Sequence, residues 1–138
     1  MKTVYRIIIA GSRDFNDYTK LKDESLKAIY RTFGKIDKNN VTIISGHAKG
    51  ADSLGERFAK EYGLNLQIFP ADWDKHGRSA GFIRNKEMAA FAKGENAESS
   101  DETIQGMLIA FWDGESKGTK AMIELAKNKK MPVVVIKY

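Results

Sequence analysis

Apolar and polar positions alternate in blocks along the chain, and these blocks predict five strands separated by four helices. The apolar run at residues 4–10 is nearly continuous, which is typical of a strand buried on both faces of a parallel sheet. Leu26, Ile29 and Phe33 recur at helical spacing within residues 19–33, and Gly34 ends that helix. The expected strands are residues 4–10, 41–44, 64–69, 107–112 and 133–137, and the other expected helices begin near 50–53, 79 and 118 and end at 62, 92 and 128.

The strict alternation of strands and helices predicts an α/β fold with a parallel sheet and helices on both faces. Right-handed crossovers leave few topologies, and we expect a Rossmann-like three-layer sandwich with strand order 3-2-1-4-5. No internal repeat or linker interrupts the 138 residues, so a single domain is expected over 1–138. Residues 93–101 are polar and are expected to form a mobile surface loop.

The composition of the chain indicates where the protein works more clearly than which reaction or ligand it serves. There is no cysteine, no apolar run of membrane-spanning length and no signal peptide pattern, so a cytoplasmic protein without a membrane partner is expected. The net charge of +5 fits either an anionic partner or lysines on solvated helix faces. We favour the second because Lys127, Lys129 and Lys130 follow one another near a helix C-terminus, where cations suit the helix dipole.

Polar clusters that contain glycine follow an expected strand or open an expected helix at four places. They lie at residues 11–13, 45–52, 72–85 and 113–119. The carboxyl ends of parallel strands share one edge of the sheet, and ligands of α/β proteins bind there. Backbone amides and short polar side chains at such an edge suit a small molecule that carries phosphate.

The first cluster supplies a glycine for close backbone approach and two groups for phosphate oxygens. Gly11 permits the approach, and Ser12 and Arg13 offer a hydroxyl and a bidentate guanidinium. The alternative is a turn with an exposed arginine. Neither the dinucleotide-binding glycine motif nor the P-loop motif is present, so no nicotinamide cofactor and no P-loop ATPase is predicted.

The second cluster places Gly46 and Gly50 before a helix, where their backbone amides suit an anion; Ser45 and His47 complete the candidate ligand contacts. Two roles are open for Asp52, a cap or first-turn residue and an acceptor for a ribose hydroxyl, and we favour the first. His47 is a candidate general base, although no partner for it is visible in the sequence. The spacing of the two histidines predicts no metal site.

The third cluster is the most specific because it sets a polar pair on the inward stripe of a helix. Arg84 and Asn85 share that stripe with Met88. A buried arginine needs an ion pair or a polar cavity. We favour a ligand site over an internal ion pair with Asp72 or Asp113.

The candidate site is completed by two further residues of the third cluster and by the fourth cluster, at residues 113–119. Gly81 allows close packing or close approach to a ligand, and Trp73 either stacks on a base or caps the core. In the fourth cluster, amides and hydroxyls at a helix start suit phosphate, although an ordinary N-cap turn would look the same. The candidate ligand contacts there are Gly114, Ser116, Gly118 and Thr119.

Together these motifs resemble the YspA/YpsA-related branch of the SLOG superfamily over roughly residues 5–137. The resemblance is carried by G-S-R-x-F at 11–15, S-G-x-A-x-G-A-D at 45–52, D-W-x-x-x-G-x-x-A-G-x-x-R-N-x-x-M at 72–88 and F-W-D-G-x-S-x-G-T at 111–119. That superfamily groups DprA/Smf-like DNA-processing proteins with LOG-like cytokinin-activating enzymes. The resemblance implies a Rossmann-like fold that binds a nucleotide-derived ligand, and the LOG-like relatives imply a homodimer.

The LOG-like relatives are phosphoribohydrolases that cleave the N-glycosidic bond of a nucleoside 5′-monophosphate, and this chain departs from their pattern. Arg84 and Met88 are kept, but Asn85 stands in a lysine position, and Lys120-Ala121-Met122 stands where two glutamates belong. A carboxylate stabilises the oxocarbenium-like state of such a reaction. The aspartates that remain for this role are Asp52, Asp72 and Asp113.

The sequence therefore predicts a protein that binds a nucleotide or a nucleotide-derived small molecule. The alternative is a phosphoribohydrolase with Arg84, Asp72 and Asp113 as catalytic residues. A third interpretation, binding of single-stranded DNA, is not favoured because the chain has no stripe of basic and aromatic residues.

Overall fold

A computed structural model describes residues 2–95, 97 and 101–138. The strands are β1 (Lys2–Gly11), β2 (Val41–Ser45), β3 (Asn65–Ile68), β4 (Glu102–Trp112) and β5 (Val133–Lys137). The helices are α1 (Tyr18–Phe33), α2 (Ala51–Tyr62), α3 (Trp73–His76), α4 (Ala80–Lys93) and α5 (Lys117–Asn128), with single 3₁₀ turns at Lys38–Asn40 and Gly77–Ser79.

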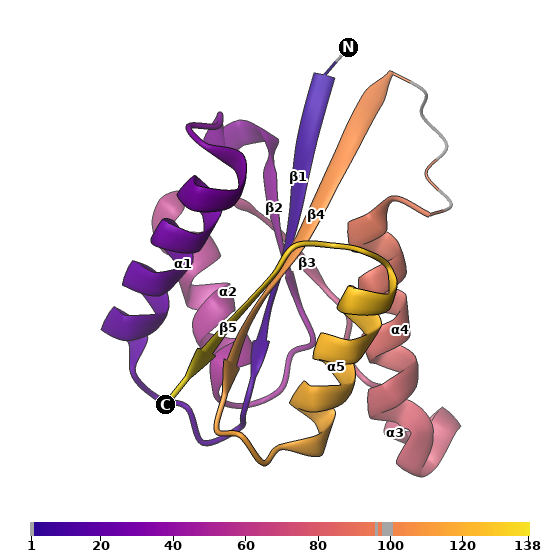
Figure 1. Ribbon diagram of the computed structural model, residues 1–138. Coiled ribbons are helices and arrows are strands. Elements are labelled where there is room, and N and C mark those ends of the chain that lie inside the picture. The colour runs from indigo at the N-terminus through magenta and orange to yellow at the C-terminus, as the bar shows by residue number, and fades with distance from the viewer. Residues whose placement is uncertain (1, 96, 98–100) are drawn as a thin grey trace.

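The five strands form one parallel sheet in the order β3-β2-β1-β4-β5, which confirms the predicted α/β Rossmann-like fold. In register, Ile7 of β1 lies opposite Ile43 of β2 and Met107 of β4. All strands end at the same edge of the sheet, which is the lower edge in Figure 1. The loops that follow β1, β2, β3 and β4 therefore meet there.

The central strand explains why both faces of the sheet need helices. Ile7 and Ile9 of β1 enter one apolar cluster, and Ile8 and Ala10 enter the other, because successive strand residues point to opposite faces. Helices α1 and α2 cover the first face, and α4 and α5 cover the second (Figure 1). This alternation is the physical basis of the continuous apolar run in the sequence.

Two elements differ most from the sequence prediction. Helix α3 was not expected, because its four residues carry no apolar repeat; it forms where the Asp72 carboxylate accepts a hydrogen bond from the backbone N–H of Lys75. Strand β4 begins at Glu102 rather than at 107, because residues 102–106 extend its pairing with β1. Residues 96 and 98–100 of the predicted loop at 93–101 lie outside the described residues, so its expected mobility stays a prediction.

The helices of the described part of the chain are all too short or too polar to cross a lipid bilayer.

Candidate functional site

Two adjoining hollows lie at the carboxyl edge of the sheet. The larger has a volume of about 380 Å³ and the smaller about 90 Å³. Arg13, Ala48 and Arg84 line both of them. The larger is lined in addition by Gly46, His47, Lys49, Pro70, Ala71 and Trp73, and the smaller by Ala10, Gly11, Asp52, Asn85, Met88, Ser116, Gly118, Thr119 and Met122.

Ser12, in the loop after β1, forms hydrogen bonds with the loops that follow β2 and β4. Its carbonyl oxygen accepts a hydrogen bond from the backbone N–H of Ala51 at 3.3 Å, and its hydroxyl oxygen accepts one from the N–H of Asp113 at 3.2 Å. Gly50 has a φ of 80° and packs so closely on Ser12 and Arg13 that a side chain would collide with their carbonyl groups. Ser12 is buried and lines neither hollow, so the structure places it as a joint between loops.

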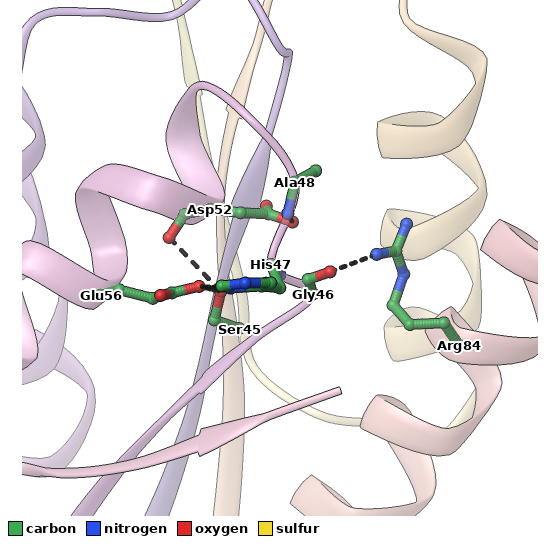
Figure 2. A network of polar contacts seen from close by, with 7 residues as sticks. All are labelled: Ser45, Gly46, His47, Ala48, Asp52, Glu56 and Arg84. Carbon is green, nitrogen blue, oxygen red and sulfur yellow. Dashed lines mark hydrogen bonds and ion pairs between the residues drawn. The ribbon is translucent and has the colours of Figure 1, made fainter. Parts of the chain in front are cut away.

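Arg84 projects from the first half of α4 into the space between the two hollows. Its Nη1 donates to the carbonyl oxygen of Gly46 at 2.5 Å (Figure 2). Its Nε donates to the side-chain oxygen of Asn85 at 3.0 Å. Burial lowers the pKa of the guanidinium, and the charge of Asp52 acts in the opposite direction. Among the described residues Arg84 has no carboxylate within salt-bridge distance.

The two carboxylates considered as ion-pair partners of Arg84 instead bond to backbone amides of their own loops. Asp72 caps α3. The Asp113 carboxylate accepts hydrogen bonds from the N–H groups of Glu115 at 2.9 Å and Ser116 at 2.8 Å. The Ser116 bond, followed by the Glu115 bond, lowers the pKa of Asp113. Neither side chain lines a hollow, and their predicted catalytic role remains a prediction.

Asp52 is the carboxylate that opens into the smaller hollow. It lies in the first turn of α2 with only 6% of its surface exposed, and Gly50 rather than Asp52 occupies the N-cap position. Its Oδ2 accepts a hydrogen bond from the backbone N–H of Ala48 at 3.2 Å. Burial raises the pKa of Asp52 to about 6, although the Ala48 hydrogen bond and the charge of Arg84 act in the opposite direction.

Gly46 lies against both the carboxylate of Asp52 and the guanidinium of Arg84. A Cβ on Gly46 would lie 2.7 Å from Nη1 of Arg84 and 2.9 Å from Oδ2 of Asp52. A side chain there would force the end of the Arg84 or the Asp52 side chain to move. The site therefore holds a cation and an anion next to the same glycine (Figure 2).

His47 has the acidic partner that the sequence did not reveal. Its Nδ1 lies 2.8 Å from Oε2 of Glu56, a buried residue in the middle of α2 (Figure 2). The hydroxyl of Ser45 donates to the same oxygen at 2.7 Å. The His47 side chain is 56% exposed and lines the larger hollow, so a buried carboxylate holds an accessible imidazole.

Sequence reasoning missed Glu56 because it searched loops for polar clusters, and Glu56 lies within a helix. A signal was present. Asp52 and Glu56 are four residues apart and share a helix face with the small residues Gly55 and Ala59, all of which are buried. Acidic residues on the inward face of an amphipathic helix need partners, and the loop before α2 supplies them.

The remaining predicted residues differ in how they lie relative to the two hollows. Trp73 is 51% exposed and lines the larger hollow, so it does not cap the core, and Gly81 lies next to the Trp73 ring and the Arg84 guanidinium. At the start of α5, the Ser116 hydroxyl accepts a hydrogen bond from the N–H of Thr119. Ser116, Gly118 and Thr119 line the smaller hollow, whereas Gly114 forms an exposed turn with a φ of 86°.

These observations define a Rossmann-like protein with a cation-lined hollow at the carboxyl edge of its sheet. The sequence model of the YspA, cpYpsA-related SLOG family matches residues 5–76, and the chain belongs to this family, as the sequence motifs predicted. The match covers the loops of Arg13 and His47 and ends before α4.

The chain is also similar to a curated protein from a bacteriophage. The chain is 28% identical to the Gene 61 protein of Mycobacterium phage D29 over 134 residues, which cover 94% of each chain. No solved structure matches it.

Proposed function

We propose that the joined hollows bind a nucleotide or a nucleotide-derived small molecule through its phosphate. The observation that carries this proposal is the half-buried guanidinium of Arg84, which faces a hollow and has no ion-pair partner among the described residues. A guanidinium has five N–H donors, and the described contacts use two of them. An anion in the hollow would offset the cost of burying this charge.

The surroundings of Arg84 favour a nucleotide over a simple anion. Arg13 and Lys49 add two cations to the larger hollow, and the exposed indole of Trp73 offers a stacking surface at its rim. Asp52 would repel phosphate, so the smaller hollow suits the hydroxyl groups of a ribose. Phosphate and sugar thus have separate places on either side of Arg84.

Isothermal titration of the protein with nucleoside 5′-mono-, di- and triphosphates tests this proposal. We expect Arg84→Met to weaken binding roughly 10- to 100-fold, as the loss of charge-assisted hydrogen bonds predicts. Arg78→Met is the matched control, because Arg78 is exposed and lines neither hollow. Absence of nucleotide binding to the unmodified protein, or equal affinity of both variants, would contradict the proposal.

A second candidate function is hydrolysis of the N-glycosidic bond of a nucleoside monophosphate, and the placement of Asp52 favours it. A buried carboxylate beside Arg84 in a sugar-sized hollow suits the stabilisation of positive charge at C1′. The C1′–N bond would break with its electron pair going to the base, water oxygen would bond to C1′, and a water proton would end on the base. Release of free base and ribose 5-phosphate, lost in Asp52→Asn, is the expected signature.

A further inference from the structure

An accessible histidine lies in the larger hollow with its backbone and its ring both held in place. His47 adopts a φ of 62°, a conformation that non-glycine residues rarely take, and its N–H donates to the hydroxyl oxygen of Ser45 at 3.0 Å. That hydroxyl in turn donates to Glu56, which contacts the imidazole. Strained backbone of this kind persists where surrounding contacts fix it, and it clusters at functional sites.

The contact with Glu56 determines which ring nitrogen is free to act. Oε2 of Glu56 accepts a hydrogen bond from the Ser45 hydroxyl, so we assign it as the acceptor of the imidazole Nδ1 proton as well. The lone pair then lies on Nε2, the nitrogen that Glu56 does not engage. A neutral imidazole oriented by a carboxylate in this way is suited to accept a proton from water.

The other residues of the larger hollow restrict the bond that such a base can help to cleave. Arg13, Lys49 and Arg84 are cations, and among the described lining residues only His47 carries a nitrogen lone pair that can accept a proton. With His47 acting as the base, no second group there is suited to protonate a leaving group. The leaving group must therefore be stable as an anion, which holds for a phosphate and not for a sugar alkoxide.

We infer that His47, positioned by Glu56, is the general base for hydrolysis of a phosphoanhydride bond in a nucleoside di- or triphosphate. This inference rests on the proposed nucleotide binding. Water oxygen bonds to the terminal phosphorus, its proton passes to Nε2 of His47, and the bridging P–O bond breaks with its electron pair remaining on the departing nucleotide. The products are inorganic phosphate and a nucleotide shortened by one phosphate, and the three cations stabilise the charge on the transferring group.

Chemical rescue of a glycine variant tests the role of His47. Glycine suits a φ of 62° and leaves room for a free imidazole, so His47→Gly is expected to fold. With ADP, ATP, GDP and GTP as probes, we expect kcat for phosphate release to fall roughly 100-fold or more. Nucleotide affinity by titration should stay within a few-fold, and added imidazole should restore phosphate release in proportion to its concentration.

Two further variants separate positioning from folding. Glu56→Gln keeps the shape of the side chain but removes its charge, and we expect a lower kcat with an unchanged KM. His76→Gly is the control, because His76 is the other histidine of the chain and lines neither hollow. Its phosphate release should match that of the unmodified protein.

The outcomes distinguish this inference from the proposed function beneath it. Nucleotide binding without phosphate release from any of the four probes would overturn the inference and leave the binding proposal standing. Phosphate release that survives His47→Gly without added imidazole would also overturn it. Failure to bind any nucleotide would remove both.

Discussion

At the scale of the residue, Asp52 gives the site its most distinctive electrostatic feature. A carboxylate that is almost fully buried has exchanged water for one backbone hydrogen bond and the charge of Arg84, and these do not compensate for the loss of water. Its pKa therefore rises to about 6 from an ordinary 3.8. The ionised side chain is held in place by the fold at a cost to stability, as is common where a group serves a ligand.

Replacing Asp52 by Asn should change how stability depends on pH. Between about pH 4 and 6 the folded protein binds the Asp52 proton more tightly than the unfolded chain does, so this group lowers the free energy of unfolding as pH rises. Asparagine does not titrate, so the variant does not lose stability in this way as pH rises. Its stability relative to the unmodified protein should rise by up to about 3 kcal/mol between pH 4 and 7.5, measured by urea unfolding. Asp74→Asn, at an exposed position of α3, should show no such change.

At the scale of the element, helix α2 carries both buried carboxylates of the site on the face that packs against the sheet. Gly55 lies on that face between Asp52 and Glu56, and a Cβ there would lie 2.9 Å from Cγ2 of Ile9 in β1. Because Gly55 has no side chain, α2 lies close to the central strand. The depth of the helix thereby sets how far Glu56 reaches towards His47.

Gly55→Ala should destabilise the protein although alanine is the better helix former. We expect a loss of about 1–3 kcal/mol, because overpacking against the branched Ile9 side chain outweighs a propensity gain of about 1 kcal/mol. Gly118→Ala in the first turn of α5 is the matched control, since a Cβ there meets nothing within 4 Å. It should be neutral or stabilise by up to about 1 kcal/mol in the same urea experiment. Equal effects of the two substitutions would contradict the close packing of α2.

At the scale of the whole molecule, the sequence predicted the architecture and the edge of the sheet at which the loops meet, but not the contacts among the charged side chains there. Apolar runs and helical repeats define strands and helices locally, and crossover handedness then fixes the strand order. Which of several aspartates turns inward is not a local property. Asp72 and Asp113 bond to amides of their own turns, whereas Asp52 and Glu56 are buried only because α2 packs on β1.

At the same scale, the positions of the cations bear on our expectation that the protein binds a nucleotide and not single-stranded DNA. Arg13, Lys49 and Arg84 surround the larger hollow at the carboxyl edge of the sheet. The lysines near the C-terminal end of α5 lie at the opposite edge, because α5 returns from the end of β4 to the start of β5, and Lys129 there is paired with Glu95 at 2.5 Å. These lysines therefore lie away from the larger hollow, and we expect them to take no part in binding there.

We expect no binding of a labelled single-stranded oligonucleotide at about 150 mM salt, measured by fluorescence anisotropy, under conditions in which a mononucleotide binds. The affinity of a protein for DNA falls with salt in proportion to the number of phosphates that it neutralises. If the protein binds DNA at low salt, we therefore expect a shallow dependence on salt that corresponds to few phosphate contacts. A DNA-binding protein would instead retain affinity at physiological salt, with a linear log–log slope corresponding to several phosphate contacts. Such a slope, together with weaker oligonucleotide binding by the Arg84→Met variant, would contradict this expectation. It would show that the hollow is one part of a longer nucleic-acid surface.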